Sequence, residues 1–151
     1  MKTEIEIDTW TNGKKRRETP YVNGKKHGLV TGWYENGQKR YEIPYVKGKK
    51  HGLATYWNEN GQKQHEISYV NGQINGFAIW WRYNGQKRYE IPYVNGQRHG
   101  LETGWFSDGS LGYLEKWHQD QKVWSMNFPF KEQIPEDAEV ELFFHETPEL
   151  I

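Results

Sequence analysis

Residues 41–46 read Tyr-Glu-Ile-Pro-Tyr-Val, residues 65–70 read His-Glu-Ile-Ser-Tyr-Val, and residues 89–94 read Tyr-Glu-Ile-Pro-Tyr-Val again. The interval is 24 residues each time. Two further sets of residues keep the same interval: Trp33, Trp57, Trp81 and Trp105, and Gly13, Gly37, Gly61, Gly85 and Gly109. A fixed period of this length is typical of repeat architectures. The sequence therefore predicts four full repeats between two degenerate ends.

Turn-forming pairs that end in glycine punctuate the repeats at alternating intervals of 11 and 13 residues. They fall at residues 12–13, 23–24, 36–37, 47–48, 60–61, 71–72, 84–85, 95–96 and 108–109. Each pair indicates a β-hairpin, and a weaker tenth signal at Gln119-Asp120 would give about eleven strands. At roughly 4.8 Å per strand the array would be about 50 Å long. We predict an all-β fold, a single-layer antiparallel β-meander of tandem hairpin repeats that is elongated and curved.

Most of the large apolar residues occupy odd positions, as in Leu29, Trp33, Tyr41, Ile43 and Tyr45. Because side chains alternate along a strand, parity predicts which face each residue takes. A two-residue turn at Asn36-Gly37 would pair Trp33 with Arg40 and separate the rings. A three-residue loop with glycine in the left-handed region would pair Trp33 with Lys39 instead. We therefore expect bulged loops of three or five residues and one nearly all-apolar odd face.

The composition indicates one structural unit of 151 residues whose core is built from rings, since the chain has eight Trp and ten Tyr. The absence of cysteine excludes disulfides and thiolate metal sites and fits a reducing compartment. The first residues lack the apolar region of a signal peptide, and no stretch approaches 18 apolar residues. We expect a soluble, cytoplasmic protein.

Charge divides the chain into two parts. Residues 1–124 hold 19 Lys or Arg against 13 Asp or Glu, a net charge of +6, whereas residues 125–151 hold one against seven, a net charge of −6. From Trp124 onward the apolar residues move mostly to even positions, as in Met126 and Phe128. We expect a repeat array over residues 1–124 and an acidic C-terminal capping segment over residues 125–151 that leaves the repeat lattice. The apolar face could be covered by this segment, by curling of the sheet, or by a homodimer partner.

The stretch Tyr21-Val-Asn-Gly-Lys-Lys-His-Gly-Leu29, followed by Trp33-Tyr34-Glu35-Asn36-Gly37-Gln38, resembles the bacterial variant of the MORN repeat. The resemblance covers roughly residues 9–122. It implies a hairpin repeat fold without catalytic residues, and bacterial proteins of this kind are commonly labelled YwqK-like antitoxins. The wider family is associated with protein scaffolding and, in eukaryotes, with phospholipid membranes. Thr9 and Arg17 depart from the pattern in the first unit, and the C-terminal segment lies outside it.

Two recurring rows of polar residues offer weak signals of chemistry. His27, His51 and His99 precede glycines, but equivalent residues in successive hairpins lie about 9 to 10 Å apart, which is too far for two ligands that each sit about 2 Å from one zinc ion. Carboxylates recur at Glu18, Glu42, Glu66 and Glu90. Their even positions predict ion pairs with Lys and Arg across strands on the polar face. We expect no catalytic residues, no metal site and no cofactor, and hence a protein that is not an enzyme.

Basic pairs flank several turns, at Lys14-Lys15, Lys25-Lys26, Lys39-Arg40, Lys49-Lys50 and Lys87-Arg88. A polyanion or a lipid surface would use such rows as phosphate contacts. The alternative is the ordinary solubility of turns and sheet edges, which the neutral total charge favours.

Large apolar residues on the even face that do not recur are better candidates, because lattice residues should repeat. Tyr34, Tyr56, Trp80 and Phe106 fit this description, with Arg82 beside them at the position equivalent to Tyr34. Exposed rings and arginines of this kind are typical hot spots of protein interfaces. We therefore predict partner-binding residues at Tyr34, Tyr56, Trp80, Arg82 and Phe106. The alternative is burial of these rings under the C-terminal segment, whose Phe143 and Phe144 need a place to pack.

The leading hypothesis is a non-enzymatic protein-binding module, and the resemblance extends it to an antitoxin or immunity protein that masks a toxin. A second hypothesis is a carbohydrate or cell-wall binder, because Gly104-Trp-Phe-Ser-Asp-Gly-Ser110 is similar to the aromatic repeats of choline- and glucan-binding proteins. A lipid-associated scaffold is the third.

Overall fold

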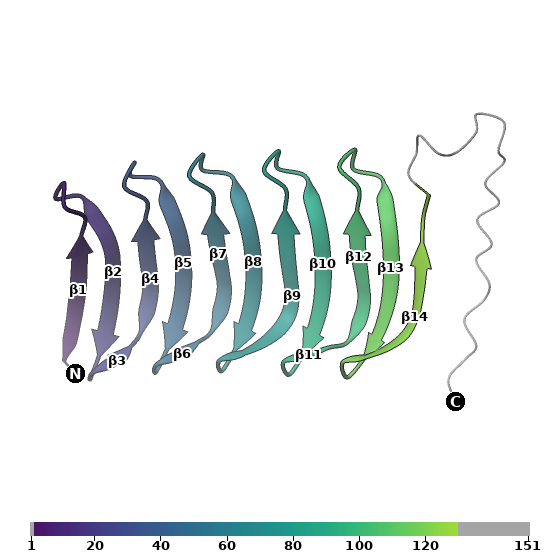
Figure 1. Cartoon of the computed structure of the whole chain (residues 1–151). Helices are drawn as coiled ribbons and strands as arrows, with labels where there is room; N and C mark the ends of the chain where they lie inside the picture. Colours follow the sequence, from purple (N-terminus) through teal and green to yellow (C-terminus); the bar gives the residue numbers. More distant parts are fainter. Residues whose placement is uncertain (1, 130–151) are drawn as a thin grey trace.

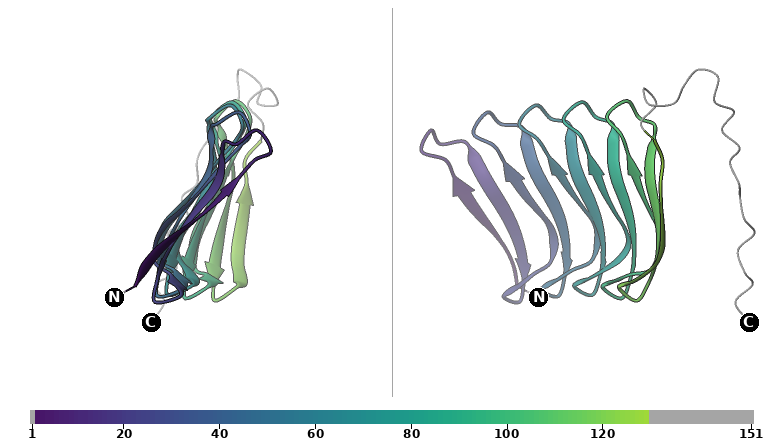
Figure 2. Two further views of the ribbon diagram at one scale, coloured as in Figure 1. Left: turned by 90° about the vertical axis from the view of Figure 1, so that its left-hand side faces the viewer. Right: turned by 45° about the vertical axis from the view of Figure 1, so that its right-hand side comes forward.

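The computed structural model describes residues 2–129, which form one antiparallel sheet (Figure 1). Eleven strands follow one another in chain order across the sheet, in the order β1-β2-β4-β5-β7-β8-β9-β10-β12-β13-β14. Three two-residue strands, β3, β6 and β11, pair beside this path with β2, β5 and β10. Seen along the array, the described strands form a single curved layer (Figure 2). The predicted all-β meander of hairpin repeats is confirmed.

The strands recur with the sequence period. Those of the first half are β1 (Thr3–Thr9), β2 (Lys15–Val22), β3 (Lys25–Lys26), β4 (Gly28–Trp33), β5 (Lys39–Val46), β6 (Lys49–Lys50) and β7 (Gly52–Trp57). The second half comprises β8 (Lys63–Val70), β9 (Gln73–Trp81), β10 (Lys87–Val94), β11 (Gln97–Arg98), β12 (Gly100–Trp105), β13 (Leu111–His118) and β14 (Gln121–Asn127). No helix that could cross a membrane is present over residues 2–129.

Two kinds of turn alternate along the array. At one end of the strands, loops of five residues such as 34–38 connect strands whose register shifts by one residue, so that Trp33 pairs with Lys39 while Gly32 pairs with Tyr41. This bulged loop and the Trp33–Lys39 pair were predicted. At the other end the turns are shorter than expected, with two central residues that both have positive φ, 49° at Asn23 and 73° at Gly24. Such angles define the tight hairpin turn that Asn-Gly favours.

The predicted all-apolar odd face is wrong, because the bulge that was expected to keep the rings together separates them. Paired residues share a face and successive residues alternate. The pair Gly32–Tyr41 therefore puts Tyr41, Ile43 and Tyr45 on the face opposite Trp33. We call the side of Tyr41 and its counterparts the tyrosine face, and the side of Trp33 and its counterparts the tryptophan face.

The buried apolar residues lie along the middle of the tyrosine face. Val30 pairs with Ile43 and Ala54 pairs with Ile67, both on this face. The core of the described chain comprises Val30, Ile43, Ala54, Ala78 and Ile91. A single row of small and branched side chains, shielded by its neighbours in the curved sheet, thus replaces the two-sided core of a globular domain.

The last repeat has carboxylates in this row. Glu102, at the position of Val30, is 5% exposed and accepts hydrogen bonds from the Tyr113 hydroxyl at 2.9 Å and from Arg98 at 3.3 Å. Burial of the phenol, together with its hydrogen bond to Glu102, raises the pKa of Tyr113. Buried polar groups need such partners, so the end of the array is held by a polar network.

The tryptophan face carries a ladder of ion pairs and rings. Lys39 bonds Glu42 at 2.5 Å, and its ammonium group lies 6.0 Å from the centre of the Trp57 ring in the next repeat. The same arrangement recurs at Lys15, Lys63 and Lys87. The predicted ion pairs of Glu18, Glu42, Glu66 and Glu90 therefore form along one strand across the bulge, not between strands. They share their face with the tryptophans.

The final strand carries the sheet past the boundary expected at residue 124. Ser125, Met126 and Asn127 pair with Glu115, Leu114 and Tyr113, so the expectation that the chain leaves the lattice at residue 125 is wrong for these three residues. The apolar residues of this strand take even positions because the register shifts by one residue between Lys116 and Trp117, as it does at the other bulges. The rest of the expected capping segment, including Phe143 and Phe144, lies outside the described residues.

Candidate binding surface

A continuous row of rings crosses the tyrosine face beside the five-residue loops. Tyr41, Tyr56, His65, Trp80 and Tyr89 come from five successive strands and pair in that order. The centres of the Tyr56 and His65 rings are 4.1 Å apart at an interplanar angle of 20°, and those of His65 and Trp80 are 6.2 Å apart at 24°. Three nearly parallel rings thus form a stacked row on this face, which we call the platform.

The platform exists because the repeat varies at one position. Gly32, Tyr56, Trp80 and Gly104 are equivalent. At Gly32 the ring of Tyr41 lies where a side chain would be, since an added Cβ would come within 2.4 Å of its Cζ. Gly104 is covered in the same way by Tyr113. In the two central repeats the rings of Tyr56 and Trp80 occupy this space themselves.

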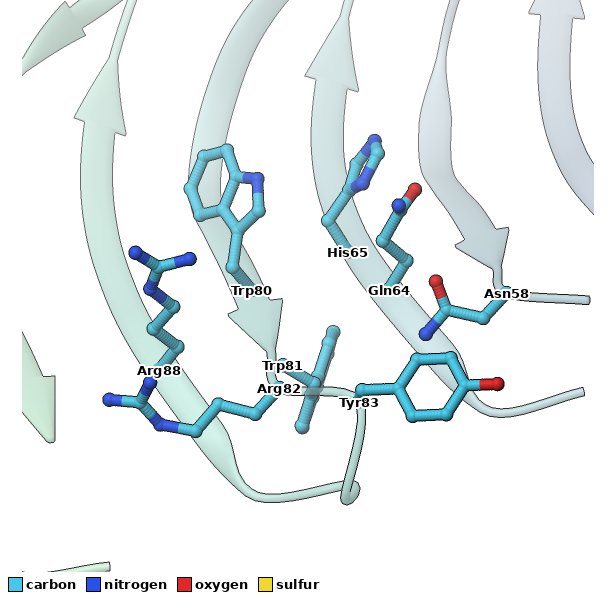
Figure 3. Close-up of a pocket in the computed structure, with 8 residues that line it drawn as sticks. All are labelled: Asn58, Gln64, His65, Trp80, Trp81, Arg82, Tyr83 and Arg88. Carbon is cyan, nitrogen blue, oxygen red and sulfur yellow. The ribbon is translucent and has the colours of Figure 1, made fainter. Parts of the chain in front are cut away.

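A hollow of about 560 Å³ opens beside the platform (Figure 3). Its lining comes from two successive hairpins: Asn58, Gln64, His65, Trp80, Trp81, Arg82, Tyr83 and Arg88. Figure 3 shows Arg82 and Arg88 on one side of the hollow, Trp80 beside them, and His65, Gln64 and Asn58 opposite. The volume falls in the range of small-ligand sites.

The bulge positions the polar part of this lining. Each bulge contributes one extra residue, which lies near the first residue of the adjoining loop. In the first two hairpins this pair is an arginine over a ring, with Arg16 5.3 Å from the centre of Trp10 and Arg40 5.6 Å from that of Tyr34. The equivalent pairs that line the hollow are Asn58 with Gln64 and Arg82 with Arg88.

The two arginines are held differently. Arg82 donates a hydrogen bond of 2.6 Å to the carbonyl oxygen of Trp105 in the next repeat, and its Nε is buried without a hydrogen-bond partner among the described residues. The guanidinium of Arg88 lies 4.7 Å from the centre of the Tyr89 ring. The lining contains no carboxylate, so this part of the described surface is basic.

Burial changes the acidity of two groups in the platform. Desolvation lowers the pKa of His65 from its ordinary value of 6.5, so the imidazole that stacks between Tyr56 and Trp80 is neutral at pH 7. Desolvation also raises the pKa of Tyr56. The rings of the platform are therefore uncharged, and the charge of the site comes from its arginines.

The structure brings together three of the five predicted binding residues. Tyr56 and Trp80 lie in the platform, and Arg82 lines the hollow. Tyr34 donates its hydroxyl to the carbonyl oxygen of Trp57 at 2.8 Å and so links two repeats. Phe106 begins the next five-residue loop, where its N–H bonds the Ser110 carbonyl at 2.9 Å. These residues do not share an even face, because Tyr34, Arg82 and Phe106 lie in loops.

Sequence reasoning missed six residues of the site, namely Asn58, Gln64, His65, Trp81, Tyr83 and Arg88. His65 could have been found, since it replaces a tyrosine at a position where Tyr41 and Tyr89 recur. Arg88 recurs as Arg40 and Arg16 and gives no such signal. Its place in the hollow depends on the bulge and on the residue that faces it.

The histidine row lies at the opposite turns. The backbone N–H of Lys47 donates to Nδ1 of His27 and that of Asn71 to Nδ1 of His51, both at 3.4 Å. The rings of His99 and His118 are 4.8 Å apart. These contacts connect neighbouring repeats.

Two consecutive segments of the chain, residues 26–47 and 50–71, match the family model of the MORN repeat variant. They run from β3 to the turn after β8, and each corresponds to one period of the array. A comparison with curated proteins found no match. The chain is thus a β-hairpin repeat protein, two of whose repeats are similar to the MORN repeat variant.

Proposed function

We propose that this chain is a non-enzymatic protein-binding module whose tyrosine face, at Tyr56, His65 and Trp80, docks a partner protein. The observation that carries the proposal is the platform of three partly exposed, nearly parallel rings beside a basic hollow. Tyrosine, tryptophan and arginine are the residues most enriched among interface hot spots. The rings of tyrosine and tryptophan give a large contact area at low cost in side-chain entropy.

The position of the platform within the repeats supports this role. Residues that maintain the lattice recur every 24 residues, as the Lys–Glu pairs and the tryptophans do. Tyr56 and Trp80 replace glycines of the outer repeats, where a tyrosine from the next strand covers the backbone. The fold therefore does not require large rings at these two positions, and binding gives them a use.

Affinity purification from the native host tests the proposal. The tagged chain should capture a stoichiometric protein partner, and the Tyr56→Ala/Trp80→Ala chain should capture at least about tenfold less, since hot-spot truncations typically cost 2 kcal/mol or more. The matched control is Leu53→Ala/Phe77→Ala, which truncates two residues exposed by 50% and 49% on the tryptophan face. Capture that is lost in the control and kept in the platform variant would refute the proposal.

The resemblance to YwqK-like antitoxins extends the proposal to a specific partner. In that case the captured protein is a toxin encoded beside this chain, and masking of its active surface neutralises it. Co-expression tests this extension, because the wild-type chain should restore growth of cells that produce the captured protein. Growth without the chain would exclude the antitoxin role while leaving protein binding intact.

Stacked rings also favour a second candidate, a carbohydrate. Sugar rings pack on flat aromatic side chains, and the polar groups of Asn58, Gln64 and Arg88 around the hollow could bond hydroxyl groups. Retention of the wild-type chain on glycan resins, lost in the Tyr56→Ala/Trp80→Ala chain, would support this alternative in place of a protein partner.

A further inference from the structure

Two arginines, Arg82 and Arg88, line the same side of the hollow, at positions where other repeats have different pairs. The loop and bulge positions hold Trp10 with Arg16 and Tyr34 with Arg40, so that each cation lies over a ring. One repeat before the hollow's arginines, the same positions hold Asn58 and Gln64. One repeat after them, they hold Phe106 and Gly112. Arg82 and Arg88 therefore form a pair of like charges that no other described repeat has.

Neither charge of this pair is neutralised by a carboxylate of the described residues. Arg82 and Arg88 form no ion pair with any residue of the range 2–129, whereas the four recurring lysines of the tryptophan face each bond a glutamate. The buried Nε of Arg82 also lacks a hydrogen-bond partner within this range. Like charges near each other disfavour each other, and an anion between them would remove the repulsion and accept hydrogen bonds from their accessible N–H groups.

The surroundings of the pair indicate which anion fits. Trp80 lies beside the arginines, with His65 and Tyr56 stacked behind it. A site of about 560 Å³ has room for more than one side chain. The tyrosine face also carries the carboxylates of Glu102 and Glu115, which face each other on adjacent strands. Glu102 is buried, but Glu115 is partly exposed and would repel an extended polyanion such as a nucleic acid, so the basic region suits a single local anion.

We infer that the hollow binds an acidic side chain of the partner protein, with an Asp or Glu carboxylate between Arg82 and Arg88 and a neighbouring flat or apolar side chain on Trp80. Guanidinium groups bind carboxylates through paired hydrogen bonds. The inference rests on the proposed function and adds the chemistry of the partner's contact segment.

A display library of random peptides tests the inference without knowledge of the partner. The baits are the wild-type chain and the Arg82→Asn/Arg88→Gln chain, which gives the hollow the same pair that the preceding repeat has in Asn58 and Gln64. This pair is already compatible with the lattice, because the preceding repeat carries it. The control bait is Arg40→Gln, which removes an equivalent arginine outside the hollow.

Wild-type and Arg40→Gln baits should enrich peptides in which Asp or Glu is adjacent to an aromatic or apolar residue. These peptides should bind the Arg82→Asn/Arg88→Gln chain at least about tenfold more weakly, as expected for loss of a charged hydrogen bond. Enriched peptides without excess carboxylates, or equal binding to both chains, would overturn the inference.

A fourth bait, Tyr56→Ala, distinguishes failure of the carboxylate site from failure of the proposed function. Peptides that depend on Tyr56 but not on the arginines would leave the protein-binding platform standing and overturn the carboxylate site alone. Peptides that depend on neither would overturn both.

Discussion

At the scale of single residues, the rings of the tyrosine face fit the backbone beneath them. The ring of Tyr41 occupies the space beside Gly32, and an added Cβ there would come within 2.4 Å of Cζ and 2.5 Å of Cε1. The φ of Gly32 is not in the left-handed region, so the demand for glycine at this position is steric. Coverage of a strand glycine by a cross-strand ring stabilises such pairs.

We therefore predict that Gly32→Ala destabilises the chain by about 1–3 kcal/mol, the usual cost of overpacking. The Tyr41→His change, which introduces the smaller ring found at His65, should recover part of this loss in the double variant. Denaturant midpoints of the three variants and the wild type give the measurement. A midpoint for Gly32→Ala equal to that of the wild type would contradict the packing described here.

His65 makes stability depend on pH. Burial lowers its pKa in the folded chain below the unfolded value of 6.5, so between these two values the unfolded state binds more protons. Stability then falls as the pH drops below about 6.5, and the fall levels off below the folded pKa. Above pH 6.5 the imidazole is neutral in both states and has no such effect.

His65→Tyr, which places at this position the residue of the neighbouring repeats, should lose this part of the pH dependence. Denaturation midpoints measured from pH 8 to pH 5 on both chains provide the comparison. The two chains differ only at residue 65, so the difference between the two curves reports His65 alone. Parallel curves would show that His65 is as well solvated in the folded chain as in the unfolded one.

The sequence alone predicted part of the candidate site. Tyr56 and Trp80 stand out because glycine holds their position in other repeats. The hollow was not predictable, since Arg88 is ordinary in its own repeat and becomes unusual only because Arg82 replaces a ring beside it. Comparing the repeats one position at a time does not show which two residues come together at a bulge.

At the scale of elements, the bulge decides which face each strand presents. The period, the number of main strands and the Trp33–Lys39 pair all follow from the turn signals in the sequence. The faces were predicted wrongly because parity was carried through the bulge, where one extra residue reverses it. Each bulge therefore shifts the alternation of side chains by one residue and places the tryptophans and the tyrosines on opposite faces.

Deletion of Arg40, the extra residue of one bulge, should destabilise the chain far more than its replacement by alanine. Without it, either Trp33 or Tyr41 must turn to the wrong face. The Arg40→Ala chain keeps the bulge and loses only the cation–π contact with Tyr34, at a cost of about 0.5–1 kcal/mol. Urea denaturation followed by tryptophan fluorescence compares the two. Equal midpoints would mean that the bulge does not set the faces.

At the scale of the whole molecule, each strand of the main path pairs only with its neighbours, as in other linear repeat proteins. Deletion of residues 49–72, one full period, should therefore leave a soluble chain with the same circular dichroism per residue and a smaller radius of gyration. Deletion of residues 49–71 is the control, because it removes one residue fewer and reverses parity beyond the junction. If both deletions unfolded the protein, the repeats would not be independent units.

Oxidative footprinting of the complex with the captured partner tests the central claim most directly, because the two faces of the sheet carry rings that can be compared within one molecule. The account predicts that the partner slows oxidation of Tyr56 and Trp80 on the tyrosine face and leaves Trp57 and Phe77 on the tryptophan face, outside the lining of the hollow, unchanged. Protection of Trp57 and Phe77 with unchanged oxidation of Tyr56 and Trp80 would contradict it.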